Sequence, residues 1–471
     1  LRVSGAMTTR LGRVSAPRRR EENSGWDIVG LSGDKDSSAH CATAAGCLAG
    51  PGHAAPTAGL RHNRAMTAPP AAPAGPAPVY LALALSLGAA VSLGITRFAY
   101  GLLLPVMKDD LAWSYTLAGA MNTVNAAGYL LGALVTPWLL RRWGAAPLLL
   151  WGSVLASVFM ALSGFFIEAA PLLLQRLLAG VASAFVFIAG GLLAARLGTR
   201  APQQAGLLLG LYYGGVGWGI ALSALGVPPL LAAARDVAHG WAWAWWGMAA
   251  LCLAATAVLV WPAKTLQKQE LSAQIGQAPE ANLTEKISWW SMRWALTGYT
   301  LFGVGYIGYM TFVIALLREQ GASAGAVTLF YTLLGLAVVA SARIWARLLD
   351  RAKGGGALAL LNALLGVATI APALTGAWPV VLASGLLFGA VFLSLVASTT
   401  AFVRHNLPAA QWAAGISAFT ILFAFGQIVG PTVVGWIADG PGGLARGLLY
   451  SAAALWLGAL AAWRQRPLAR T

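Results

Sequence analysis

Charged residues are scarce in this chain, and their scarcity excludes most soluble folds. Only 10% of the 471 residues are charged, whereas a soluble domain has about 25%. Hydrophobic residues make up 58% of the chain, and its mean hydropathy is +0.70. These values predict an integral membrane protein.

Cysteine and histidine are also too few and too scattered to suggest metal or redox chemistry. Of the three cysteines, Cys41 and Cys47 lie in a polar N-terminal tail, and Cys252 lies within an apolar stretch. The sequence has no disulfide framework, no metal-ligand spacing and no nucleophile–base signature. We therefore expect no cofactor, no metal and no enzymatic activity.

Long apolar stretches are what the chain has in place of charge. A membrane-spanning helix needs about 20 mostly apolar residues, and twelve stretches meet this length. They cover roughly residues 79–105, 114–139, 146–166, 170–195, 205–230, 241–262, 292–316, 324–348, 356–376, 378–403, 410–437 and 444–463. They are too long for barrel strands and lack their alternating pattern, so we expect an all-α membrane protein.

Lysine and arginine alternate between the loops, and this alternation predicts the topology. One set of loops and termini carries 18 of these residues, and the opposite set carries only Lys108, Arg235, Arg318 and Arg446. Loops rich in Lys and Arg stay in the cytoplasm, so both termini are expected there. The net charge of +16 thus reflects topology, and we expect no nucleic-acid partner.

The second half of the chain repeats the first without a gap. Tyr100 aligns with Tyr309, an offset of 209 residues (309 − 100), and the same offset aligns Gly180 with Gly389. It also aligns three further glycine pairs, 206 with 415, 217 with 426 and 226 with 435. Two parallel repeats of six spans are the architecture of the major facilitator transporters.

Four motifs strengthen this resemblance. Arg176-Leu-Leu-Ala-Gly180 resembles the fourth-span motif of major facilitator transporters, and Gly426-Gln427-Ile-Val-Gly430-Pro431 resembles an eleventh-span signature. Asp350-Arg351-Ala-Lys353-Gly354 resembles the family's cytoplasmic loop motif. The first-span segment 94–105 and the pairs 305–306 and 311–312 are similar to the YbfB/YjiJ-type subfamily. The resemblance covers residues 79–464.

The resulting organisation has six parts. We expect a tail at 1–65, a Pro/Ala linker at 66–78, an N-terminal six-helix half at 79–262, a cytoplasmic linker at 263–291, a C-terminal half at 292–464 and a tail at 465–471. Residues 1–65 are either sequence upstream of a translation start at Met66 or a disordered cytoplasmic extension.

Charges inside the spans indicate the binding site. A cation in the middle of a span is costly and usually functional. Arg97 and Arg176 are predicted at similar depths, as are Asn122 and Asn125. In the family that this sequence resembles, spans one and four line the central cavity. For Arg176, helix packing or coupling is an alternative to substrate contact, and Arg97 has a structural alternative too.

The second half offers hydroxyls in place of these cations. Arg97 aligns with Tyr306 in the repeat, and Tyr299, Tyr306 and Tyr309 share one helix face. Such a stripe serves either packing or binding. We predict that the substrate contacts a set of polar and aromatic residues from both halves: Arg97, Tyr100, Asn122, Asn125, Arg176, Tyr306, Tyr309 and Gln427.

The cytoplasmic loop motif gives candidate gating residues. Asp350 and Arg351 belong to the C-terminal copy, and Arg142 is the mate of Arg351 in the N-terminal copy. The N-terminal copy lacks an acid, because Arg141 stands where the second half has Asp350. A charge interaction that closes this side can therefore take its acid only from Asp350.

Acidic residues are missing from the middle of every span. They lie near the outer ends, at positions 109, 110, 168, 236, 319 and 439. Proton-driven export of cationic drugs usually needs a buried acid, so this absence favours an anionic or amphiphilic substrate. The absence of an ATP-binding Gly-x-x-x-x-Gly-Lys-Ser/Thr motif favours a gradient as the energy source.

Together these features predict a secondary transporter that moves a small organic solute by alternating access with proton coupling. We expect a monomer in the bacterial inner membrane, with a small-molecule substrate and membrane lipid as its partners. Multidrug efflux is the first alternative. A non-transporting membrane sensor or scaffold is the second.

Overall fold

The computed structural model describes residues 77–273, 287–408 and 411–468, and every regular element in these ranges is a helix. The first half contains α1 (Pro78–Ala89), η1 (Ala90–Ile95), α2 (Tyr100–Asp110), α3 (Tyr115–Trp143), α4 (Ala145–Ser163), α5 (Ala169–Arg200), η2 (Pro202–Gln204), α6 (Ala205–Ala233) and α7 (Trp241–Ala273). The second contains η4 (Trp289–Met292), α8 (Arg293–Glu319), α9 (Ala324–Arg351), α10 (Gly356–Leu374), α11 (Trp378–Asn406), α12 (Trp412–Ala438) and α13 (Gly443–Trp463).

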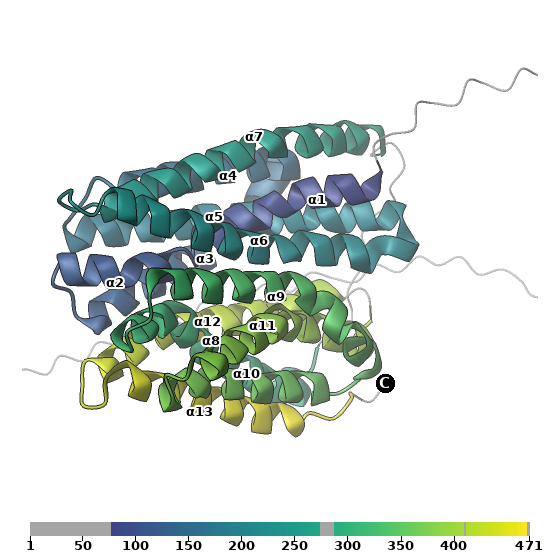
Figure 1. Cartoon of the computed structure of the whole chain (residues 1–471). Coiled ribbons are helices and arrows are strands. Elements are labelled where there is room, and N and C mark those ends of the chain that lie inside the picture. The colour runs from purple at the N-terminus through teal and green to yellow at the C-terminus, as the bar shows by residue number, and fades with distance from the viewer. Residues whose placement is uncertain (1–76, 274–286, 409–410, 469–471) are drawn as a thin grey trace, which may run out of the picture. The chain divides into compact units, whose positions relative to one another are not determined.

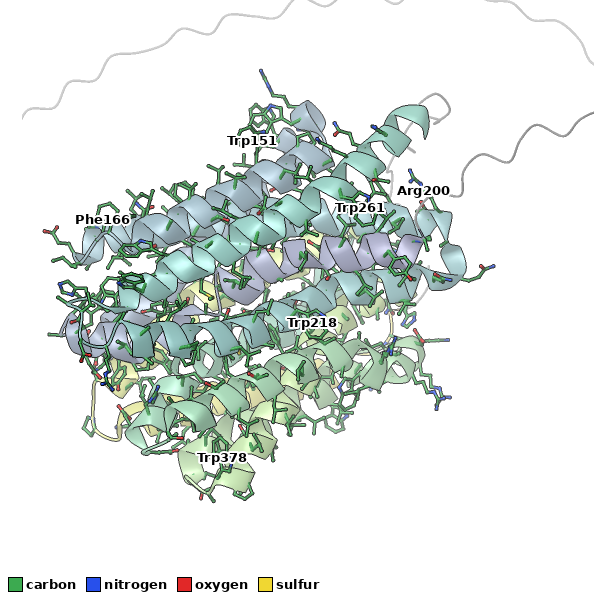
Figure 2. The ribbon with its side chains drawn as sticks, turned by 45° about the horizontal axis from the view of Figure 1, so that its top comes forward. Trp151, Phe166, Arg200, Trp218, Trp261 and Trp378 are labelled. Carbon is green, nitrogen blue, oxygen red and sulfur yellow. The ribbon has the colours of Figure 1, made fainter. Side chains whose placement is uncertain are left out.

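Twelve spans in the described residues are long and apolar enough to cross a membrane, which confirms the predicted fold class. One of them, Pro78–Asp110, is built from α1, η1 and α2 together. Large apolar side chains are exposed on the helix surfaces, among them Trp151, Trp218 and Trp261 (Figure 2). So much exposed apolar surface needs a lipid environment.

The two halves repeat each other in the details of their helices. Ser114 and Ser323, which are 209 residues apart, both cap the next helix by accepting a backbone N–H bond. A Cβ on Gly180 or on Gly389 would lie 2.1 or 2.2 Å from a backbone oxygen of α3 or α9, respectively. The matching glycines therefore permit the same close helix contact in each half.

The halves meet along three helix pairs. Helix α3 packs against α12, α6 against α9, and α2 against α8. Figure 1 shows the first half as the purple-to-teal group of helices and the second half as the green-to-yellow group. The site described below lies where α2, α3 and α5 approach α8.

The bundle has two chemically different ends. We call the end with Asp109, Asp110, Asp236, Glu319 and Asp439 the acidic end, because the connections there carry most of the described acidic side chains. The connections at the opposite, basic end follow helices that finish in cations, namely Arg142, Arg200, Arg351 and Arg404.

The first span is interrupted in its middle. The backbone N–H groups of Thr96 and Phe98 bond to Val91 and Leu93, five residues back, at 3.1 Å each. Residues 96–99 then form a turn before α2 begins. Such π-type irregularities are frequent at functional sites. The sequence indicated one apolar stretch over 79–105 and gave no sign of this break.

The predicted tails and linkers lie mostly outside the described residues. Residues 1–76, 274–286 and 469–471 are in this class, so the predicted boundaries near them stay predictions. Helix α7 continues to Ala273, past the expected start of the central linker at residue 263.

Candidate functional site

The break in the first span leaves backbone carbonyls that side chains from other helices bind. Thr96 O accepts a bond of 2.8 Å from Arg176 on α5, and Phe98 O accepts one of 2.9 Å from Tyr331 on α9. An unpaired carbonyl in a membrane interior is costly, so the bond to Thr96 O stabilises the turn, and the bond from Tyr331 adds to the one that Phe98 O accepts from Gly101 N at 3.2 Å. Arg97 lies between the two carbonyls and is thereby fixed in the middle of the bundle.

Arg176 directs both of its terminal nitrogens to protein groups, while its Nε has no hydrogen-bond partner among the described residues. Its Nη1 donates to Thr96 O at 2.8 Å, and its Nη2 donates to Asn122 Oδ1 at 3.0 Å. Its guanidinium carbon lies 5.1 and 5.6 Å from the ring centroids of Tyr100 and Trp245, within range of cation–π attraction. Arg176 therefore joins α5 to the turn and to α3.

Asn122 extends this network to the other half. Its amide accepts from Arg176 and donates to Thr311 Oγ1 of α8 at 2.9 Å. Thr311 in turn donates to Ile307 O on its own helix at 2.7 Å. The chain of bonds from Arg176 through Asn122 to Thr311 crosses from one half to the other.

Tyr100 and Asn125 complete the same network. The Tyr100 hydroxyl donates to Ala118 O at 2.9 Å, and the Asn125 amide donates to Arg176 O at 2.9 Å. The structure thus brings Tyr100, Asn122, Asn125 and Arg176 together in one network, and their contact with substrate stays a prediction. Their polar groups bind mainly to the protein itself.

Arg97 differs from Arg176. It is only 3% exposed, yet its Nε and Nη2 have no hydrogen-bond partner among the described residues. Arg176 lies close enough for the two like charges to repel each other, and Tyr129 and Tyr306 lie close enough for their hydroxyls to interact with the charge of Arg97. A buried cation without a counter-charge is costly. Such a group is suited to bind an anion.

Tyr306 belongs to an aromatic stack formed by three helices. Its ring lies 4.7 Å from Phe302 on α8, 5.1 Å from Phe392 on α11 and 5.5 Å from Phe423 on α12, with interplanar angles of 25°, 20° and 19°. Tyr299 stacks on Phe423 at 5.0 Å. The C-terminal side of the site is therefore a wall of nearly parallel rings.

Tyr309 and Gln427 are less directly connected to Arg97. The Tyr309 hydroxyl shares a 2.7 Å bond with Ser384, and its ring stacks on Phe388 at 4.1 Å. Gln427 is 3% exposed, and within the described ranges no hydrogen bond joins it to another candidate residue.

The candidate gating residues lie apart at the basic end. Arg142, Asp350 and Arg351 are all exposed, and Arg142 lies over Trp138 of its own helix at 5.8 Å. No ion pair to Asp350 is present among the residues that the structure describes. Their gating role stays a prediction for a conformation in which the basic ends approach each other.

The hydrogen bonds that the structure describes between the halves lie instead in the middle of the bundle and toward the acidic end. The Asp439 carboxylate, just after α12, accepts from the backbone N–H groups of Tyr115 and Thr116 at 2.7 and 2.9 Å, and from the Thr116 hydroxyl at 2.6 Å. The Tyr115 hydroxyl donates to Glu319. A carboxylate on the free N–H groups of the first turn of α3 is favourably placed.

This environment changes the acidity of Asp439. Burial raises the pKa of its carboxyl, but the hydrogen bonds from Thr116 and Tyr115 and the nearby charge of Lys108 outweigh burial and hold the pKa below its usual value. The charged form therefore belongs to the conformation in which the acidic ends are joined.

Small residues allow the backbones to approach closely at this end. A Cβ on Gly119 of α3 would lie 2.2 Å from Pro431 O of α12, and one on Gly435 would lie 2.2 Å from Tyr115 O. Sequence reasoning singled out neither Asp439 nor Gly119 as an inter-half contact. The available signal was the run of small residues in the Gly-Pro segment of α12.

The fold and this site define a transporter of the major facilitator type. The chain belongs to the family described as uncharacterised MFS-type transporter YbfB, whose model matches residues 89–463. This confirms the predicted superfamily and subfamily. No curated protein matches the chain.

Two solved structures illustrate the similarity of fold. A bacterial homologue of the human lysosomal transporter Spinster, inward-facing and unoccupied, is 15% identical with a TM-score of 0.60, and the match covers 83% of this chain and 97% of that one. The nucleoside transporter NupG is 13% identical with a TM-score of 0.60, and the match covers 81% of this chain and 98% of that one. At these identities the comparison concerns the fold alone.

Proposed function

We propose that this protein is a secondary active transporter that moves a small organic anion by alternating access. Arg97 is its anion-binding residue, and Arg176 is a positioning residue that holds the turn at 96–99. The observation that carries this proposal is the contrast in partners. Both terminal nitrogens of Arg176 donate, to Thr96 O and Asn122 Oδ1, and its Nε has no partner, whereas both Nε and Nη2 of Arg97 donate to no described residue.

The chemistry of the surroundings supports an anion over a cation. No acidic side chain is among the buried polar residues of the described bundle. Arg97 and Arg176 repel each other, and an anion between Arg97 and the hydroxyls of Tyr129 and Tyr306 relieves this repulsion. A guanidinium offers the paired donors that suit a carboxylate.

We further propose an orientation and an energy source. The basic end lies in the cytoplasm of a bacterial inner membrane, as Lys- and Arg-rich loops do. The conformation with joined acidic ends is then the one closed to the outside. An ion gradient drives transport, and the proton is our candidate for the coupled ion.

Multidrug efflux is the second candidate function. The aromatic wall of Tyr299, Phe302, Tyr306 and Phe423 favours it, because flat apolar drugs stack on such rings. It differs from the first candidate in one respect: efflux of neutral and cationic compounds does not need the charge of Arg97.

Uptake into proteoliposomes tests the proposal. The full chain is reconstituted, and labelled organic anions, cations and neutral solutes are supplied with and without an imposed pH gradient. We expect Arg97→Gln to lower anion uptake at least about tenfold, the loss of one charged hydrogen-bonding group. Arg97→Lys should recover part of it, since a point charge cannot replace a planar fork.

The controls separate binding from folding. Trp151→Leu, on the exposed surface of α4, should transport like the parent, and thermal melting should show that the Arg97 variants are folded. Normal anion uptake by Arg97→Gln contradicts the anion proposal. Arg97-independent uptake of cations and neutral drugs favours efflux.

A further inference from the structure

The surroundings of Arg97 specify more than a negative charge. Two groups of aromatic side chains, one from each half, approach it. The first-half group consists of Tyr129 on α3, Phe187 on α5 and Tyr212 and Tyr213 on α6, with ring centroids 5.2–6.4 Å apart. The second-half group is the stack of Tyr299, Phe302, Tyr306, Phe392 and Phe423.

Both groups lie beside the turn that carries Arg97. Phe98, the next residue, places its ring 5.9 Å from Phe392 of the second-half stack, and Tyr129 follows Asn125, which donates to Arg176 O, by one turn of α3. Tyr213 is 38% exposed, although Gly217, one turn further along α6, lies against Gly335 of α9 in the other half. A side chain with these two properties faces the space between the halves, so that space is bordered by rings on both sides of the cation.

We propose that the transported anion is an aromatic carboxylate, with a flat ring system directly attached to the charge that Arg97 binds. This inference rests on the proposed function and narrows its substrate class. The carboxylate lies against Arg97 and the hydroxyls of Tyr129 and Tyr306. Its ring then lies between Tyr213, the most exposed ring of the first group, and Phe423, the partly exposed ring of the second.

Ring contacts make the inference quantitative. An aromatic pair contributes beyond the burial of area, by about two- to tenfold in affinity per pair. A saturated ring of similar size lacks this contribution. A neutral aromatic amide keeps the ring contacts but loses the charge interaction with Arg97.

Three probe compounds separate charge from aromaticity. Binding of naphthalene-2-carboxylate, decahydronaphthalene-2-carboxylate and naphthalene-2-carboxamide to the purified full chain is measured by calorimetry at neutral pH. We expect the aromatic acid to bind at least about tenfold more tightly than either of the other two. Arg97→Gln should weaken the acid but not the amide.

Variants locate the ring. Phe423→Leu should bring the affinities of the aromatic and saturated acids toward equality, and Tyr213→Leu gives a second test at a less buried position. The matched control is Trp151→Leu, an aromatic residue on the outer surface of α4 (Figure 2), which should keep the full difference.

Each outcome has a distinct meaning. If both acids bind equally and both need Arg97, the aromatic inference is wrong while the proposed function stands. If naphthalene-2-carboxylate does not bind, the inference is also wrong, and the uptake experiment decides the proposed function alone. If the amide binds as tightly as the acid, charge recognition by Arg97 is contradicted.

Discussion

The two ends of the helix bundle differ in how they hold the two halves together. At the acidic end, Asp439 of one half caps the first turn of α3 in the other, and Gly119 and Gly435 let α3 and α12 touch. At the basic end, Asp350 and Arg142 are exposed, and no described ion pair reaches Asp350. Close packing and a carboxylate hold the two halves together at the acidic end. At the basic end, the loop motif that contains Asp350 does not connect the two halves within the described residues.

This difference locates the candidate site relative to the closed end. The bond from Asn122 to Thr311 crosses the halves next to Arg176, and Tyr331 crosses them to reach Phe98 O. Any separation of the acidic ends must therefore break bonds that hold the turn around Arg97. We expect binding at Arg97 and the opening of the acidic end to be coupled for this reason.

The largest effect is expected from a methyl group on Gly119. Its Cβ would lie 2.2 Å from Pro431 O, and overpacking of this kind costs about 1–3 kcal/mol. Gly119→Ala should therefore open the acidic end in a large fraction of molecules. Double electron–electron resonance measures this opening as a longer distance between two spin labels. The labels are attached at Asp236→Cys and Leu374→Cys, one exposed position in each half.

Gly206→Ala is the matched control for this substitution. Gly206 lies on α6 near the basic end, with no atom within 4 Å of an added Cβ. The label distance should stay unchanged in this variant, and helix propensity should slightly favour alanine. An unchanged distance in Gly119→Ala would mean that α3 and α12 do not hold the acidic end closed.

The fold was predictable because its signals are distributed along the chain. Twelve apolar stretches and one offset of 209 residues specify two six-helix halves. The capping residues Ser114 and Ser323 and the glycines 180 and 389 repeat with that same offset. Each half therefore carries its own copy of the information.

The candidate site was predictable only in part. The cost of burial identifies Arg97 and Arg176 as important but cannot distinguish them, because their difference lies in hydrogen-bond partners from α3 and the turn. Likewise, Asp439 gains its role from the N-terminus of α3, 323 or more positions away in the chain. Such pairings depend on which helix of one half meets which helix of the other.

The next largest effect is expected from Asp439→Asn, compared with Asp350→Asn at the other end. The asparagine loses the charge and places an amide group near donors, which costs about 1–3 kcal/mol. The population of molecules with the long label distance should rise about five- to a hundredfold relative to the population with the short distance. Asp350→Asn should leave it unchanged or reduce it, since any bond of Asp350 belongs to the opposite conformation.

These two variants therefore have effects of opposite sign or of very different size. An equal rise of the long distance in both would contradict the distinction between the two ends. A fall in the long distance with Asp350→Asn would support the predicted gating role of Asp350.

A smaller effect is expected from pH. The pKa of Asp439 is lowered in the joined conformation. The charged carboxylate therefore stabilises this conformation fully above the ordinary carboxyl pKa of 3.8, and this stabilisation is lost as pH falls through the lowered pKa of Asp439. Acidification into this range should increase the long label distance in the parent. Asp439→Asn should show a weaker dependence, and equal dependence in both would exclude Asp439 as the titrating group.

The smallest effect is expected from the hydroxyl of Tyr115. Tyr115→Phe removes the bond to Glu319 but keeps the backbone bond to Asp439 and the ring beneath Lys108, whose Nζ lies 4.5 Å from its centroid. Exposed charged contacts contribute about 1 kcal/mol or less, so the long-distance population should rise by no more than about fivefold. Glu319→Gln should act similarly, and the double variant should add little, because both changes remove one interaction. If the two effects add fully, Tyr115 and Glu319 act independently, and Asp439 remains as the carboxylate that joins the acidic ends.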